Sequence, residues 1–134
     1  MGQRIDQLVA RVEDPANPVV WLDPSTSAEL WAALPDALKQ RSFAVVLLDG
    51  VSDRASLRDE LLGVLGANGA IRDALASLPA NGANAQGWVI LFQDPEKLRE
   101  NDEAAFEDLL ETAAQIHEMH WSQRRTHLKL VVKD

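Results

Sequence analysis

Four short apolar runs, separated by segments with helical periodicity, constrain the fold of this chain more than any other feature. The runs are Val19–Leu22, Phe43–Leu48, Trp88–Phe92 and Leu128–Val132. The second and third are continuously apolar, a pattern typical of strands covered on both faces. The last run alternates around Lys129, which indicates a strand with one wetter face. Because helical segments separate the runs, the sequence predicts an α/β fold with a small parallel sheet flanked by helices.

The segments between the runs contain signals for where helices begin and end. Thr26 and Glu29 have the spacing of a capping box, and Pro35 is expected to break or kink the helix that follows them. The longest helix is predicted over about Asn101–Trp121, and another over roughly the first twelve residues. Small residues over Pro79–Gln86 predict a loop that returns the chain to the sheet.

Two helices are predicted between the second and third apolar runs. Ser52 or Asp53 is expected to cap the first of them, and Gly66 to end it. The second is short and is expected to begin at Asn68 or Gly69. The glycines in this region allow the chain to turn sharply from one helix into the next.

A length of 134 residues is one at which a single hydrophobic core is usual. We therefore expect one domain over residues 1–134. Within it, residues 1–42 form an N-terminal helix and an added βα unit, and residues 43–134 form the main α/β core.

The charge balance excludes some classes of ligand. Acidic side chains number 21 and basic ones 13, which gives a formal net charge of −8. Nucleic-acid backbones are bound by clustered Lys and Arg, so a nucleic-acid ligand is not expected. An acidic surface suits solubility and also a basic protein partner, since opposite net charges steer two proteins together.

Compartment and membrane association are constrained by what the chain lacks. It contains no cysteine, which excludes disulfide frameworks and thiolate metal sites. Its N-terminal residues lack the apolar core of a signal peptide, and no apolar run approaches the ~20 residues of a membrane span. We expect a cytoplasmic protein that does not contact membranes.

No catalytic or metal-binding motif is complete. His117 and His120 resemble part of the zinc-protease helix motif, but they are three residues apart instead of four. These histidines are expected at the surface near a helix end. The chain has no phosphate-binding Lys loop and no Ser-His-Asp arrangement. It is therefore expected to be no enzyme and to use no metal or cofactor.

Two aspartates raise an alternative function. Asp49 and Asp94 come directly after the second and third apolar runs. Ligands of open α/β sheets bind at this edge, where an aspartate can hold magnesium or contact a phosphate. A nucleotide- or phosphate-handling domain is therefore the first alternative, although both aspartates also suit tight turns. A structural adaptor or oligomerisation module is the second alternative.

From Phe43 onward the chain resembles the barstar family of ribonuclease inhibitors. The resemblance lies in the strand Phe43–Leu48 with its Asp49-Gly50 turn, the short helix containing Asp73-Ala74-Leu75, and the strand Gly87–Phe92. The order β-α-α-β-α-β over the last two-thirds of the chain is that of the family. The resemblance implies that residues 43–134 form a barstar-like core.

The same resemblance implies a function and a site. Barstar-like proteins inhibit small basic ribonucleases by inserting the segment after their first helix into the enzyme cleft. The equivalent segment here contains Asn68, Gly69, Arg72, Asp73 and Ser77, with Ser77 in the place of the family's second acid. The leading hypothesis is a non-enzymatic protein-binding domain, and its expected partners are basic proteins such as a ribonuclease or a toxin.

Overall fold

The fold is a four-stranded sheet between two layers of helices. The computed structural model describes residues 5–22, 26–78 and 86–133. Along these ranges the elements, in chain order, are α1 Ile5–Glu13, β1 Val19–Leu22, α2 Ala28–Gln40, β2 Phe43–Leu48, α3 Arg54–Leu65, α4 Ile71–Ala76, β3 Gly87–Gln93, α5 Glu96–Asn101, α6 Glu103–Arg124 and β4 His127–Lys133.

All strand pairs in the sheet are parallel, and the strand order is β1-β4-β3-β2. The predicted α/β class with a small parallel sheet is confirmed. The first two apolar runs match β1 and β2 residue for residue, whereas β3 and β4 extend beyond the predicted runs. Both extensions follow from pairing, because Gly87 pairs with His127 and Gln93 pairs with Lys133.

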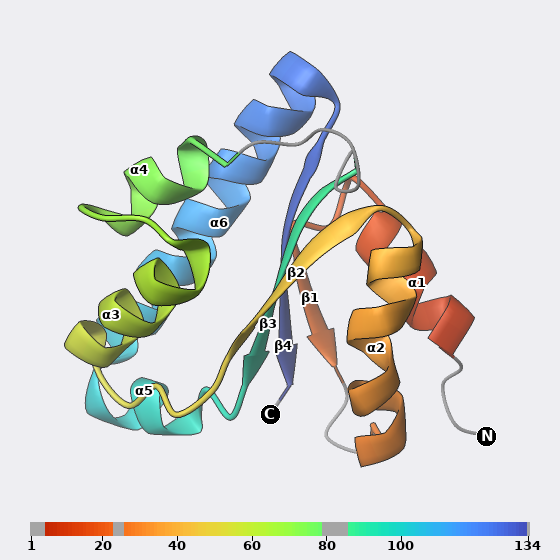
Figure 1. Ribbon diagram of the computed structural model, residues 1–134. Helices are drawn as coiled ribbons and strands as arrows, with labels where there is room; N and C mark the ends of the chain where they lie inside the picture. The colour runs from red at the N-terminus through yellow and green to blue at the C-terminus, as the bar shows by residue number, and fades with distance from the viewer. Residues whose placement is uncertain (1–4, 23–25, 79–85, 134) are drawn as a thin grey trace.

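Helices cover both faces of the sheet (Figure 1). One face carries α1 and α2, and the other carries α3, α4, α5 and α6. Two clusters of buried apolar side chains fill the two interfaces between sheet and helices. The two inner strands, β3 and β4, are therefore covered on both faces. None of the helices in the described residues has the length and apolar composition that a membrane crossing needs.

The start and the course of α2 differ from the prediction. The N-cap is Ser27, whose side chain accepts a hydrogen bond from the Leu30 N–H at 3.1 Å, so the prediction of a Thr26 cap was wrong. The helix also continues through Pro35 to its end at Gln40. Proline removes one backbone hydrogen bond. Buried side chains on either side of the proline, among them Trp31 and Leu38, hold the two halves of the helix on one core.

The ends of α3 follow local signals as expected. Asp53 accepts from the Ser56 N–H at 2.8 Å, and the Ser56 hydroxyl accepts in turn from the Asp53 N–H at 3.0 Å. Gly66 ends the helix with a positive φ of 65°. The short helix begins later than predicted, since its N-cap is Ala70. Most of the loop predicted over 79–86 lies outside the described residues.

The long helix predicted over about Asn101–Trp121 is α6, Glu103–Arg124, and the short helix α5 that precedes it was not predicted. A break at Asp102, which has a φ of −155°, separates α5 from α6. The Asp102 side chain then caps α6 by accepting from the Ala105 N–H at 3.0 Å. Aspartate is a strong N-cap residue, so the start of α6 at this point has a local cause.

The prediction of a wetter face around Lys129 was wrong. The Lys129 side chain has 0% of its surface exposed, and β4 is buried on both faces. The cause is the strand order, which places β4 between β1 and β3.

Candidate functional site

The five residues predicted to bind a partner lie in one stretch, Gly66–Leu78, which we call the α4 segment. Its buried side chains, Ala74, Leu75 and Leu78, anchor it to the core. Two glycines with positive φ, Gly66 at 65° and Gly69 at 92°, form the turn that leads into α4. Left-handed backbone is readily adopted only by glycine, so these residues permit the sharp turn that sets the helix on the surface.

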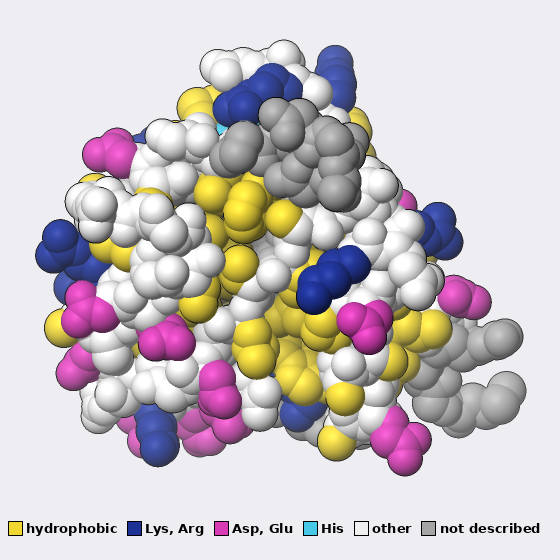
Figure 2. Space-filling view, in the orientation of Figure 1, with side chains coloured by type: hydrophobic (Ala, Val, Ile, Leu, Met, Phe, Trp, Pro, Cys, Tyr) yellow, Lys and Arg dark blue, Asp and Glu magenta, His cyan; other side chains and the backbone are white. Residues whose placement is uncertain are grey.

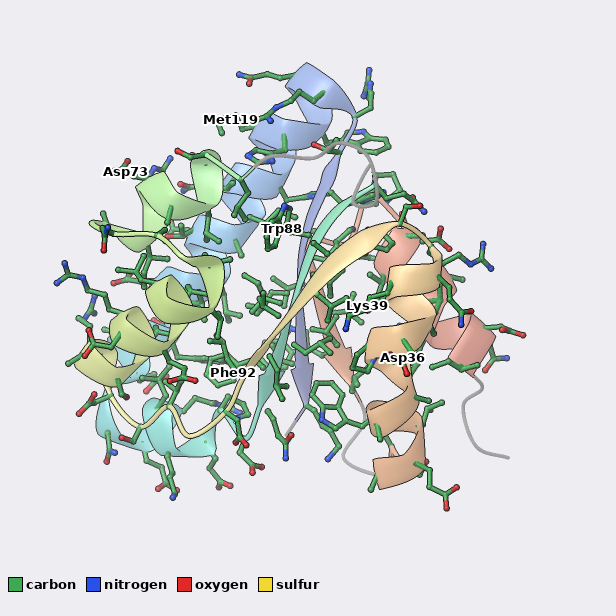
Figure 3. All side chains as sticks on the ribbon, in the orientation of Figure 1. Asp36, Lys39, Asp73, Trp88, Phe92 and Met119 are labelled. Carbon is green, nitrogen blue, oxygen red and sulfur yellow. The ribbon has the colours of Figure 1, made fainter. Side chains whose placement is uncertain are left out.

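All five predicted residues are exposed, and the amphipathic pattern of α4 is the cause. The exposed residues are Asn68, Gly69, Arg72, Asp73 and Ser77. The structure therefore brings them together on the solvent side of one short helix and its leading turn. Figure 3 shows Asp73 on the outer side of α4.

Asp73 is the acid available to a partner in this segment. Its carboxylate has no hydrogen-bond or ion-pair partner within the described ranges. Arg72 precedes it in sequence, but the Arg72 guanidinium donates to Gln115 Oε1 of α6 at 2.5 Å. The Ser77 hydroxyl donates to the Asp73 carbonyl oxygen at 2.8 Å. The carboxylate also lies in the first turn of α4, where the helix dipole favours a negative charge.

A groove of about 440 Å³ runs beside the α4 segment, between α3 and α6. Three arginines line it: Arg54, Arg58 and Arg72. Arg54 is paired with Asp102 at 3.4 Å and Asp108 at 3.1 Å, and these bonds raise the pKa of its guanidinium. Sequence reasoning missed this groove. The four-residue spacing of Arg54 and Arg58 on one helix was the available signal.

Asp49 and Asp94 do meet at the edge of the sheet where strands β2 and β3 end. They line one hollow of about 340 Å³, together with Glu96, Lys97 and Glu100. Four carboxylates and one ammonium group give this hollow a negative charge, which repels phosphate groups. In residues 5–22, 26–78 and 86–133, no three or more His, Asp or Glu side chains are grouped so that they could hold a metal ion.

The opposite end of the sheet contains a buried polar cluster formed by His117, His127 and Lys129, the lysine–histidine cluster. Lys129 Nζ donates to the backbone carbonyls of Asp14 and Asn17, the latter at 2.6 Å. Burial lowers the pKa of Lys129 to about 8, against the attraction of the Asp14 carboxylate. The ammonium group thus holds the loop between α1 and β1 onto β4.

The histidines are buried, so the prediction of surface histidines was wrong. His117 Nδ1 accepts from the Leu128 N–H at 3.1 Å. Its Nε2 must then bear the proton, which it donates to the Pro15 carbonyl at 2.9 Å. In the same way His120 Nε2 lies 3.2 Å from the Ala76 carbonyl. Burial lowers the pKa of both rings.

His127 completes the lysine–histidine cluster. Its ring stacks on His117 with centroids 5.8 Å apart and packs against Trp121 at 5.0 Å. Burial first, and then the charges of Lys129 and His117, lower the pKa of His127 to about 4. The three rings are therefore neutral near pH 7. They pack as buried side chains of the core.

Comparison of the chain with models of known protein families, with curated proteins and with solved structures returned no match.

Proposed function

We propose that this chain is a non-enzymatic protein-binding domain that docks a basic protein through the α4 segment. The observation that carries the proposal is the Asp73 carboxylate, exposed and without a partner among the described residues, on a short helix anchored to the core. Because the backbone of this helix is already anchored, the segment loses little backbone freedom on binding. The net charge of −8 adds a long-range attraction to a basic surface.

The class of partner follows from chemistry and from the barstar resemblance. A carboxylate at the tip of a convex segment suits a concave site lined by Arg or Lys, because the two charges pair as the interface excludes water. The resemblance implies a small basic ribonuclease, and a basic toxin with a similar cleft is the other candidate partner. Asn68 adds an exposed amide in the same segment.

The test is a binding comparison between Asp73→Ala and a matched control, Glu107→Ala. Both side chains are exposed carboxylates on helices, and Glu107 lies outside the α4 segment. A panel of purified small basic ribonucleases and toxins is titrated by calorimetry, and inhibition of RNA cleavage is measured in parallel. Truncating one member of a buried charge pair costs ~2–5 kcal/mol, so Asp73→Ala should weaken binding by more than about tenfold.

The control decides which surface is used. Glu107→Ala should leave the affinity nearly unchanged, since an exposed acid contributes about 0–1 kcal/mol. If instead Glu107→Ala and Glu111→Ala weaken binding and Asp73→Ala does not, the interface is the acidic face of α6. If no basic protein of the panel binds, the proposed partner class is wrong.

The meeting of Asp49 and Asp94 in one hollow favours a second candidate, a nucleotide- or phosphate-handling domain. The negative charge of that hollow would require magnesium to bridge to a phosphate. Calorimetric titration with ATP and GTP, each with magnesium, separates the two candidates. Saturable binding that Asp49→Asn and Asp94→Asn abolish would favour this second function over docking.

A further inference from the structure

Strand β2 is an edge strand, and its own six residues have none of the features that usually protect such an edge. Its six residues, Phe43–Leu48, contain no charge and no proline. Leu47 is 46% exposed, and Ala44, Val45 and Val46 are only half-buried. In Figure 2 hydrophobic side chains form a broken strip down the middle of this face, between the helix layers that Figure 1 shows. Edges of this kind attract another strand.

The other edge of the sheet, β1, is protected. It has only four residues, and Pro15 and Pro18 lie just before it. The Arg11 guanidinium donates to the Trp21 carbonyl at 2.9 Å, so a side chain of α1 already occupies an outward acceptor of this edge. Prolines, short strands and charged side chains are the usual ways of blocking strand addition. The two edges of the sheet therefore differ, and β2 is the open one.

The open backbone groups of β2 can be assigned from one hydrogen bond. The Ser42 carbonyl accepts from the Gln86 N–H at 3.0 Å, on the side of β3. Successive residues of a strand direct their N–H and C=O groups to opposite sides. Phe43, Val45 and Leu47 therefore direct theirs away from β3, toward the side on which another strand would add.

The charges at the two ends of β2 have opposite signs. Lys39 and Arg41 precede the strand, and Figure 3 shows Lys39 projecting from α2 beside it. Asp49 follows the strand directly, in the hollow that also contains Asp94. A second copy of β2 laid antiparallel places each positive end against a negative end. A parallel copy would place like charges together.

We propose that β2 is a self-association edge, at which two copies of the chain pair β2 with β2, antiparallel, about a two-fold axis. In an antiparallel pair of strands, two facing residues form two backbone hydrogen bonds with each other only when both direct their N–H and C=O groups toward the other strand. That condition places Val45 against Val45 of the partner subunit and Phe43 against Leu47 of the partner subunit. The same register places Arg41 against Asp49 of the partner subunit.

This dimer continues the sheet through both subunits and covers the exposed Leu47. Two-fold pairing is self-complementary, which is the usual arrangement of soluble homodimers. The edge uses none of the five α4-segment residues named above, so the inference does not depend on the proposed function. Dimerisation can fail while docking succeeds, and the reverse.

The first test is the mass of the protein in solution, measured by sedimentation velocity and light scattering over a wide concentration range. The wild-type chain should reach twice its monomer mass of 14.7 kDa. Leu47→Lys should remain a monomer, because it places an unpaired ammonium group in the dimer interface. The control is Val64→Lys on α3, where an exposed apolar side chain (37%) is changed in the same way. It should still form dimers.

A charge exchange tests the antiparallel register. Arg41→Asp should weaken dimerisation by roughly several-fold, since it places a carboxylate against Asp49 of the partner subunit. The double variant Arg41→Asp with Asp49→Arg should restore it. Far-ultraviolet circular dichroism verifies that each variant is folded. The proposal is overturned by a wild type that stays monomeric, by a Leu47→Lys variant that still dimerises, or by a charge exchange that restores nothing.

Discussion

Two groups of polar side chains in this molecule differ in almost every physical respect. The lysine–histidine cluster is buried, and its His117 and Lys129 hold backbone groups of the loop before β1 and of the start of β4. The α4 segment is exposed, and its Asp73 carboxylate contacts none of the described side chains. The cluster consists of the residue types that usually perform chemistry, yet its geometry is that of a core.

The difference shows how a shifted pKa should be interpreted in this fold. The low pKa values of His127 and Lys129 arise mainly from burial. These low values reflect the free-energy cost of removing the charged forms of these groups from water. A functional site needs access as well as a perturbed group. The α4 segment has this access, which is why the proposed docking surface is located there.

The largest expected effect on stability comes from changing Lys129 of the buried lysine–histidine cluster. Lys129→Ala should lower the free energy of unfolding by ~2–5 kcal/mol, because it leaves a cavity and removes the donor from two carbonyls. Urea denaturation measures the loss. Lys129→Met is the matched control, since it keeps most of the volume and should cost less. A loss below ~1 kcal/mol for Lys129→Ala would mean that the lysine does not hold the loop.

The next effect is a loss of stability in acid. The pKa of His127 is about 4 in the folded protein, against 6.5 in the unfolded chain. Between these values the unfolded state binds more protons, so stability falls as pH decreases from about 6.5 to 4. The expected loss is ~3 kcal/mol. His127→Phe removes this titrating group and keeps an aromatic ring. The free energy of unfolding, measured by urea denaturation at each pH, should therefore fall less steeply from pH 6.5 to 4 in the variant than in the wild type. If the free energy of unfolding changes with pH in the same way in both proteins, the low pKa of His127 is wrong.

A gain of stability in base should be somewhat smaller. The pKa of Lys129 is about 8 in the folded protein and 10.5 in the unfolded chain. The unfolded state therefore binds more protons between these values, and stability rises by ~2 kcal/mol from pH 8 to pH 10. The chain has no tyrosine and no cysteine to titrate in the same range. Thermal denaturation between pH 8 and pH 10 should show this rise in stability in the wild type, and the rise should be absent in Lys129→Met.

The smallest effect on stability is expected from changing Asp73 of the exposed α4 segment. Asp73→Ala should change the free energy of unfolding by less than ~1 kcal/mol, through loss of a favourable charge at the start of α4. Chemical denaturation of Asp73→Ala beside Asp73→Asn gives the measurement. A loss comparable to that of Lys129→Ala would show that Asp73 supports the fold, and would remove the contrast between the two groups.

Much of the fold could be predicted because its signals are local. The run Phe43–Leu48 is apolar at every position, and it forms β2 with the predicted bounds. The cap at Asp53 and the stop at Gly66 depend on a few neighbouring residues. The exposure of Asp73 follows likewise from the amphipathic pattern of one short helix. Where the prediction was wrong locally, as at Thr26, two neighbouring residues could each cap the same helix, and Ser27 does so.

Other features depend on distant parts of the chain. Lys129 is buried because β4 became an inner strand and because the carbonyls of Asp14 and Asn17, more than a hundred residues earlier, came to lie beside it. The hydrogen bond from Arg72 to Gln115 likewise depends on the packing of α4 against α6, which are far apart in the sequence.

The sequence by itself determined the strands, most helix ends and the exposed face of α4. Each of these depends on backbone preference and on the spacing of apolar residues within a few turns of chain. Only the tertiary structure decided the strand order, the burial of the three histidines and of Lys129, and which edge of the sheet stays open. Those features depend on which surfaces meet, and surfaces meet through long-range packing that no local pattern encodes.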